Sequence, residues 1–255
     1  MVRVSVIVLT WNHLDYTKKA MESLKPLLTC DDEVIVVDNN SIDGTQAYLE
    51  SLSSLNGFLS PVYLHLSDRH LSITQAYNIG IKKSKGLFVF IYDNDLEIVE
   101  PGTLDHMISV FHDRPDAGIV CPHTDNLIGR LRNIPGPEKK FNRIEQFHMK
   151  HNRPYPVCPS AAWLIRREVI EKVGGFDERY EGYGMLDFDY ARCVMLAGYT
   201  ILLDGFVFVK HYGSITAKDY DIQPMLRKQA RQFNEKWNLP AADIRPVRFR
   251  GVEND

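Results

Sequence analysis

Four apolar, β-branched runs, each followed by a stretch with helical spacing, constrain the fold of this chain more than any other feature. The runs cover residues 2–9, 34–37, 61–66 and 87–92. Nearly continuous apolar strands are typical of a parallel sheet that is covered on both faces. Their alternation with helices predicts a doubly wound α/β fold, a mostly parallel sheet with helices on both faces.

The remaining elements follow from the same periodicities. We expect helices at residues 14–24, 72–83, 101–114, 167–172, 187–197 and 223–237, with a further helix starting near residue 41. Gly86 is expected to close the helix at 72–83 as a C-terminal glycine. Short strands are expected at residues 117–120, 161–165, 200–203 and 207–209. Residues 122–157, rich in proline, asparagine and charge, predict a long irregular segment.

Composition excludes several classes of protein. A net charge of −3 gives no global basic field for nucleic acid, and the four cysteines form no CxxC pair, so a zinc site is not expected. The start of the chain lacks the pattern of a secretory leader, and no apolar run approaches the ~20 residues that span a bilayer. We therefore expect a cytoplasmic protein, with peripheral contact to a membrane left open.

The turn Asp93-Asn94-Asp95 directly follows the fourth apolar run. Two carboxylates this close repel each other in an apolar site unless a cation or solvent compensates them. Mg2+ and Mn2+ prefer carboxylate oxygens and commonly keep substrate phosphates as further ligands. The alternative is a solvated turn, in which Asp and Asn are common anyway.

Two other strand ends carry polar or aromatic side chains. Asp38 follows the second apolar run, where its carboxylate could accept from a nucleobase ring N–H, while Thr10-Trp11-Asn12 follows the first. A loop with a good helix cap would explain Ser41 and Asp43 but not the pair Asn39-Asn40. Trp11 could stack on a base, although a lone tryptophan is more often part of a core. Ligands of doubly wound sheets bind at this edge, outside the carboxyl ends of the strands.

Together these stretches resemble the inverting family-two glycosyltransferases of the GT-A fold. The matching segments, in the family's order, are 4–12, 34–45, Asn78-Ile79-Gly80-Ile81, 87–95, Gly174-Gly175-Phe176-Asp177-Glu178, 183–189 and His211-Tyr212-Gly213-Ser214. The resemblance implies a single GT-A type domain over residues 1–255. Residues 1–100 would bind the nucleotide sugar, 101–240 would form an acceptor-side half with a small antiparallel region, and 241–255 would be a tail.

The resemblance also implies a role for individual residues. Asp95 and His211 would hold Mn2+ or Mg2+, and Asp187 would be the general base. The residues implied for the nucleotide sugar are Thr10, Trp11, Asn12, Asp38, Asn40, Arg69, Asn78, Asp93 and Asn94. Asp38 suits uracil or thymine and leaves guanine open, so a UDP-sugar is the favoured donor. A metal would stabilise the diphosphate leaving group and the base would take the acceptor's proton.

The sequence departs from the family at Leu186, where a glutamate usually precedes the base. Asp187 could instead be a helix cap, with Asp189, Asp177 or Glu178 as the base. His211 could be a packed strand histidine. Trp163 and Gly184 are weak candidates for the acceptor site, and Trp163 could equally be core.

Three rival readings differ in class. A nucleotidyltransferase is disfavoured because no glycine-rich basic loop follows the first strand, and a dehydrogenase because no GxGxxG does. A catalytically inactive sugar-nucleotide-binding or scaffold protein stays open as a hypothesis, and Leu186 is the residue that motivates it.

The expected acceptor is a hydroxyl of a saccharide or glycoconjugate, with a nucleic-acid acceptor left open. The tail carries a basic cluster, Arg245, Arg248 and Arg250, that a solvated face would explain.

Overall fold

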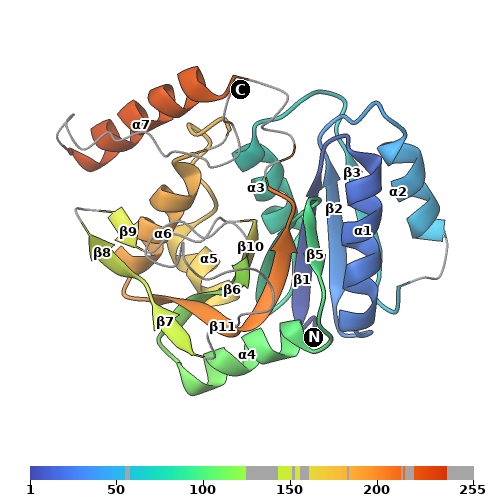
Figure 1. Cartoon of the computed structure of the whole chain (residues 1–255), viewed down its shortest axis with the longest axis horizontal. Helices are drawn as coiled ribbons and strands as arrows, with labels where there is room; N and C mark the ends of the chain where they lie inside the picture. The colour runs from blue at the N-terminus through green and yellow to red at the C-terminus, as the bar shows by residue number, and fades with distance from the viewer. Residues whose placement is uncertain are drawn as a thin grey trace.

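The central sheet organises the whole chain (Figure 1). The computed structural model describes residues 1–54, 58–124, 143–150, 153–155, 161–182, 184–213, 215 and 221–239. The main sheet has nine strands within these residues, in the order β3-β2-β1-β4-β10-β6-β11-β5, with β7 also paired to β11. The strands are β1 (Val4–Thr10), β2 (Glu33–Asp38), β3 (Val62–Leu66), β4 (Phe88–Asp93), β5 (Leu96–Ile98), β6 (Ala117–Thr124), β7 (Ile144–Gln146), β10 (Ala162–Arg166) and β11 (Thr200–His211).

Strand direction changes between the two halves of the sheet. The four strands β3, β2, β1 and β4 are all parallel. Beyond them β10 runs antiparallel to both β4 and β6, whereas β11 is parallel to β6 and antiparallel to β5 and β7. A separate antiparallel pair is formed by β8 (His148–Lys150) and β9 (Arg153–Tyr155). The parallel half therefore brings four carboxyl ends to one edge.

Helices cover both faces of the sheet, and each face has its own core. They are α1 (Leu14–Leu24), α2 (Thr45–Ser54), α3 (Ile73–Lys83), α4 (Thr103–Asp113), α5 (Arg167–Val173), α6 (Leu186–Leu196) and α7 (Gln223–Trp237), with a 3-10 turn η1 (Lys25–Leu27) after α1. Alternate side chains of β1 separate the two cores. Val6 packs with α1, α2 and α4, whereas Ile7 packs with α3, α5 and α6 and with Phe233 of α7.

The arrangement confirms the α/β class and the helices on both faces that the sequence predicts. Three expectations about elements are wrong. The segment 122–157, expected to be irregular, contains the end of β6 and the strands β7, β8 and β9. The strands expected at 200–203 and 207–209 are one strand, β11, which continues through an irregularity between Asp204 and Phe208. Gly86 does not cap α3, because the cap is Ser84. A Cβ on Gly86 would lie 2.4 Å from the backbone nitrogen of Ser5, so glycine is needed there for close packing against β1.

Some expectations concern residues that the structure does not describe. The basic tail cluster lies outside the described residues, as does most of the segment 122–157, of which β7, β8 and β9 are described. Tyr183 and Ser214 of the matched motifs also lie outside them. Among the helices that are described, none combines the length and apolar character needed to cross a membrane.

Candidate active site

The site lies where the parallel strands end. Thr10 at the end of β1 is in register with Asp38 at the end of β2, and Leu9 is in register with Asp93 at the end of β4. Because neighbouring parallel strands stop at the same level, the three predicted strand-end motifs share one edge of the sheet. This is the edge at which open α/β sheets bind their ligands.

Asp38 links the loops that follow β1 and β2 through hydrogen bonds. Its carboxylate accepts hydrogen bonds from Thr10 Oγ1 at 2.9 Å, Gln46 Nε2 at 2.8 Å, and Ser41 N and Oγ at 2.9 and 2.6 Å. Asp38 and Thr10 are both fully buried. The two side chains predicted for the nucleoside therefore bond to each other and hold the loops after β1 and β2 together.

Asn12 and Asn40 let the loops after β1 and β2 turn sharply. Both have left-handed backbones, with φ of 52° and 64°, a conformation that Asn tolerates better than most residues. Asn12 also bonds across to the second loop: its backbone nitrogen donates to Ser41 Oγ at 2.7 Å, and its side-chain Oδ1 accepts from Ile42 N at 2.9 Å. The two loops thus form one bonded unit.

Trp11 lies partly exposed on this unit, and its ring is not in the core. It packs against the ring of His70, with centroids 4.5 Å apart and planes tilted by 56°. Arg69, beside His70 on the β3–α3 connection, is exposed. The pair of rings forms an aromatic wall next to the strand ends, in the place where a flat base could lie.

Asn78 serves a different purpose from the one expected at the phosphates. Its Nδ2 donates to Phe176 O at 2.8 Å and to Glu178 Oε1 at 2.9 Å, and its Oδ1 accepts from Phe176 N at 2.8 Å. The side-chain nitrogen and oxygen of Asn78 therefore both have hydrogen-bond partners. Asn78 ties α3 to the loop 174–178 and so joins the two halves of the chain.

Asp93 is held by a buried tyrosine. Tyr77 of α3 donates a hydrogen bond from its hydroxyl to Asp93 Oδ1 at 2.6 Å. Burial raises the pKa of Asp93 to about 7, assisted by the negative charges of Asp95 and Asp187 and opposed by the Tyr77 hydrogen bond and the charge of His211. The charge of Asp187, in the first turn of α6, is the smallest of these influences on the pKa of Asp93.

Asn94 points away from the site. Its Nδ2 donates to Thr17 Oγ1 of α1 at 2.9 Å and to Asn12 O at 3.2 Å, and the residue is buried. The side-chain nitrogen of Asn94 is therefore already bonded to protein on both of its donors. Asn94 instead attaches the turn 93–95 to α1 through its hydrogen bond to Thr17.

Asp95 and His211 form a close, buried pair. His211 Nε2 lies 3.3 Å from Asp95 Oδ2, and the exposed fractions of the two side chains are 6% and 12%. Burial raises the pKa of Asp95, but the charge of His211, its hydrogen bond and the backbone nitrogen of Ile215 outweigh burial and lower it overall.

These two side chains fit a divalent cation. A carboxylate oxygen and an imidazole nitrogen are donors that Mn2+ accepts, and they lie close enough to share one ion. Among the described residues no group of three or more His, Cys, Asp or Glu forms a ready metal cluster. A cation held by Asp95 and His211 would therefore need further oxygen ligands from a substrate diphosphate or water.

Asp187, the base that the resemblance implies, is the only one of the four candidate carboxylates named among the influences on the pKa of Asp93. It lies in the first turn of α6 and is partly exposed. Leu186 beside it is buried in the core, 4% exposed, so the position where the resembling family carries glutamate here faces protein instead of the site.

The alternative bases are engaged in structural bonds. Asp189 is buried and bonds to Lys236 Nζ at 2.7 Å, Trp237 Nε1 at 2.8 Å and Tyr180 OH at 3.1 Å. Asp177 pairs with Arg179 and Lys236, and Glu178 accepts from Asn78. Each of the three alternative carboxylates therefore holds two parts of the fold together.

The two weak acceptor candidates lie within packed protein. Trp163 is fully buried, and its ring stacks on Phe176 and contacts Tyr190. The structure therefore supports the interpretation of Trp163 as a core residue. Gly184 is buried with a φ of 128°, and a Cβ there would lie 2.7 Å from Leu226 of α7. Its lack of a side chain permits close packing of the loop on α7.

Sequence reasoning missed two residues of the site, Tyr77 and His70. Tyr77 has a signal in hindsight: Ile73, Tyr77 and Ile81 repeat at the spacing of one helix face, and a tyrosine on a buried stripe needs a partner for its hydroxyl. His70 has no comparable signal, because its contact with Trp11 depends on how two loops meet.

Comparison with known proteins agrees with this geometry. The model of a family described as "Glycosyl transferase family 2" matches residues 5–174. An uncharacterized protein of Sinorhizobium fredii, y4gI, is 24% identical in an alignment of length 254 that covers 92% of this chain and 27% of that protein. The chain thus spans a minor part of the length of this relative.

Two solved structures share the fold. The mannosyltransferase PcManGT of Pyrobaculum calidifontis, in complex with GDP-Man and Mn2+, superposes with a TM-score of 0.65 at 20% identity, over 93% of this chain and 72% of that one. GalNAc-T7 with UDP, GalNAc and Mn2+ gives 0.68 at 15% identity, over 93% and 49%. At these identities the likeness establishes the fold, which is the GT-A type expected from the sequence.

Proposed function

This chain belongs to glycosyl transferase family 2, and on that premise we propose that it transfers a sugar from a nucleotide diphosphate sugar to a hydroxyl of an acceptor. The reaction would depend on a divalent metal and invert the anomeric carbon. The observation that carries the proposal is the close pair of Asp95 and His211 at the strand end that also bears Asp93. A fold alone does not fix a function, but a placed set of reacting groups supports one.

The donor would lie across the ends of β1, β2 and β4. Trp11 and His70 offer an aromatic surface for the base, and the loops held by Asp38 and Asn12 would surround the ribose. The solved relatives contain GDP-Man in one case and UDP with GalNAc in the other, which supports a nucleotide-linked sugar as donor. A UDP-sugar remains our favoured donor.

The diphosphate would lie at the Asp95–His211 pair. When bound there, Mn2+ or Mg2+ would act as a Lewis acid on the leaving group. Asp95 suits this role because its carboxylate is nearly buried and lies 3.3 Å from the imidazole nitrogen of His211. The presence of Mn2+ in both solved relatives is consistent with the proposed cation.

Asp187 would act as the general base. Its carboxylate would accept the proton of the acceptor hydroxyl as that oxygen attacks the anomeric carbon. The bond from the anomeric carbon to the diphosphate oxygen breaks in the same step, and the released nucleoside diphosphate takes the electron pair. One direct displacement inverts the anomeric carbon and needs no covalent intermediate on the protein.

A donor screen tests the proposal. We expect UDP-Glc, UDP-Gal, UDP-GlcNAc, UDP-GalNAc or GDP-Man to raise the melting temperature with Mn2+ and to raise it less without Mn2+, because ligands that bind only the folded state stabilise it. At least one donor should then release nucleoside diphosphate in a coupled assay. Stabilisation with no release from any donor, whatever acceptor is added, would favour the inactive sugar-nucleotide-binding protein that Leu186 suggested.

A further inference from the structure

The side chain of Gln229, on α7, is buried without a hydrogen-bond partner. Gln229 is 1% exposed. In the part of the chain that the structure describes, neither its Nε2 nor its Oε1 is hydrogen-bonded. A glutamine amide offers two donors and an acceptor, and native proteins leave few buried polar groups unbonded. We therefore expect this amide to find partners in some state of the protein.

The amide of Gln229 faces two glycines of the loop between Tyr180 and α6. Gln229 Nε2 lies 3.7 Å from the place that a Cβ on Gly182 would take, and Oε1 lies 3.7 Å from that of Gly184. These Cβ atoms would also lie 2.3 Å from Met225 Sδ and 2.7 Å from Leu226 Cδ2. Because neither glycine has a side chain, the backbone of the loop can approach the amide closely.

The two glycines have unused hydrogen-bonding groups of their own. Gly182 and Gly184 are both buried, and among the described residues neither backbone takes part in a hydrogen bond. A peptide group needs an acceptor for its N–H and a donor for its C=O, and a glutamine amide supplies both. Unbonded groups of matching kind thus lie on the two sides of one contact, between the loop and Gln229.

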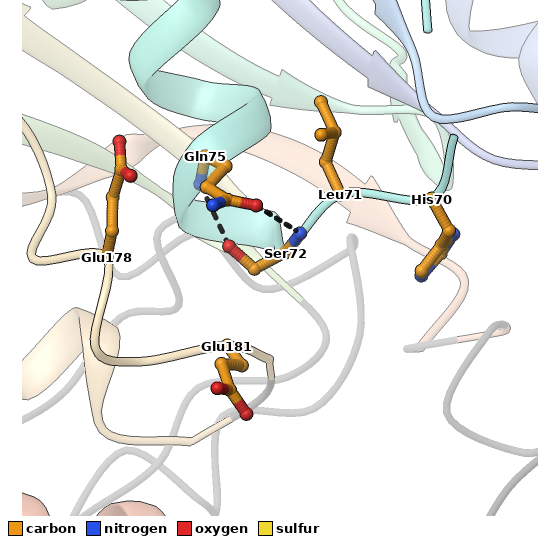
Figure 2. Close-up of a pocket in the computed structure, with 6 residues that line it drawn as sticks. All are labelled: His70, Leu71, Ser72, Gln75, Glu178 and Glu181. Atoms are coloured by element: carbon orange, nitrogen blue, oxygen red, sulfur yellow. Dashed lines mark hydrogen bonds between the residues drawn. The ribbon is translucent and has the colours of Figure 1, made fainter. Parts of the chain in front are cut away.

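The loop is held on both sides of these glycines but only weakly between. Thr74 Oγ1 of α3 donates to Tyr180 O at 2.8 Å, and α6 begins at Leu186. Between them, Glu181 pairs with Lys228 of α7 at 2.7 Å, but both side chains are more than half exposed, and such pairs contribute little. Figure 2 shows Glu181 on the loop beside the start of α3, where both line a pocket of about 360 Å3. The loop is therefore not packed tightly on its α3 side.

A shift of this loop reaches Asp187. Gly184 comes three residues before Asp187, which lies in the first turn of α6. The charge of Asp187 contributes to the raised pKa of Asp93, and the same Coulomb interaction acts in return on Asp187. A donor and its cation at Asp95 and His211 would bring new charge to this region. Donor binding would therefore change the force on the carboxylate that the loop carries.

We propose that Gln229 is a positioning residue for Asp187. When the donor and its cation bind, the loop moves against α7, and the amide of Gln229 forms hydrogen bonds with the backbone of Gly182 and Gly184. These bonds hold Asp187 in place for the acceptor hydroxyl. The inference rests on the proposed function, because it gives α7 a part in orienting the base of that reaction.

Hydrogen exchange of the whole chain tests the bonds, read by mass spectrometry on a peptide that contains residues 181–186. In the wild type we expect UDP with Mn2+ to slow exchange of this peptide by about threefold or more. Gln229→Met keeps the length of the side chain but removes its donors and acceptor, so UDP with Mn2+ should not slow exchange in this variant. Gln223→Met, at the exposed start of α7, is the matched control and should behave as the wild type.

Stability and rates separate positioning from structural support. Gln229→Met loses no hydrogen bond that the donor-free protein has, so its free energy of unfolding in urea should equal or exceed that of the wild type. Its kcat should fall by about tenfold or more, because the base is less well placed. Its Kd for UDP with Mn2+ should stay close to the wild-type value. Gln229→Leu replaces Gln229→Met if the latter does not fold.

Several outcomes overturn the inference. They are an unchanged kcat in Gln229→Met, the same slowing of exchange in this variant as in the wild type, and a wild type whose melting temperature rises with UDP and Mn2+ while exchange does not slow. Failure of both Gln229 variants to fold overturns it as well, since the amide would then support the donor-free fold. Absence of nucleoside diphosphate release from every donor would count against the proposed function instead, and the exchange measurement would still decide on the bonds.

Discussion

His211 Nε2 lies 3.3 Å from Asp95 Oδ2 because β11 and β5 pair in antiparallel register, with His211 opposite Leu96. The backbone nitrogen of Tyr212 also donates to Asp95 O at 3.0 Å, which locks the end of β11 to the strand-end turn. The second half of the chain thereby completes a site that the first half begins.

The first prediction concerns this pair. Asp95→Asn and His211→Ala should each weaken the Mn2+-dependent binding of UDP by about tenfold or more, because each removes a ligand from a site that has few. Isothermal titration of UDP at fixed Mn2+ measures the effect. His112→Ala, at the exposed end of α4, is the control, and equal affinity in all variants would mean that the cation binds elsewhere.

The second prediction assigns the base. Asp187→Asn should lower kcat by about 10²–10⁴-fold, the usual contribution of a general base, while the Kd of the donor stays within a few-fold of the wild type. Initial rates and donor titrations separate the two quantities. Glu168→Gln at the start of α5 is the matched control. If Asp187→Asn turned over at the wild-type rate, the base would have to be another group.

Much of the fold could be predicted because long apolar runs and helical spacing are local signals. The bounds expected for α1, 14–24, agree with Leu14–Leu24. β5 could not be found in this way, since its three residues are too few to show a period. The sequence predicted a break within β11 at Asp204-Gly205, where the apolar pattern stops. The strand continues there through a shift in its register with β6.

The site was predictable in its position but less so in its contacts. Strand-end residues were expected at one edge of the sheet because parallel strands end together, and Thr10, Asp38 and Asp93 lie there. Which way each side chain points depends on tertiary packing. Asn94 turns to α1 and Asn78 to the loop 174–178, and neither direction is encoded in a local pattern.

The third prediction concerns the attachment of α7. Lys236 bonds Asp177 at 2.8 Å and the buried Asp189 at 2.7 Å. Lys236→Met would leave Asp189 without its cation, and a buried acceptor that loses a partner destabilises a protein by about 2 kcal/mol. Urea unfolding measures the change. Lys228→Met on the same helix breaks an exposed pair and should change the free energy of unfolding by less than about 1 kcal/mol. Equal effects of the two substitutions would contradict the role of Lys236 in attaching α7.

The fourth prediction is a loss of stability in acid that depends on Asp32. Its side chain is fully buried and accepts from Arg3 Nε at 2.9 Å, Arg3 Nη2 at 2.8 Å and Thr29 N at 2.8 Å. Burial raises the pKa of Asp32, but the bonds to Arg3 and Thr29 outweigh burial and lower it below its ordinary value.

A carboxyl whose folded pKa is lowered stabilises the fold above the unfolded pKa of about 3.9, and this stability is lost as the pH falls through that value toward the folded pKa. The melting temperature of the wild type should therefore drop more steeply between about pH 5 and 3 than that of Asp32→Asn, which starts lower at pH 7. The exposed neighbour offers the control: Asp31→Asn should follow the wild-type curve. Parallel curves for the wild type and Asp32→Asn would show that other carboxylates govern the acid transition.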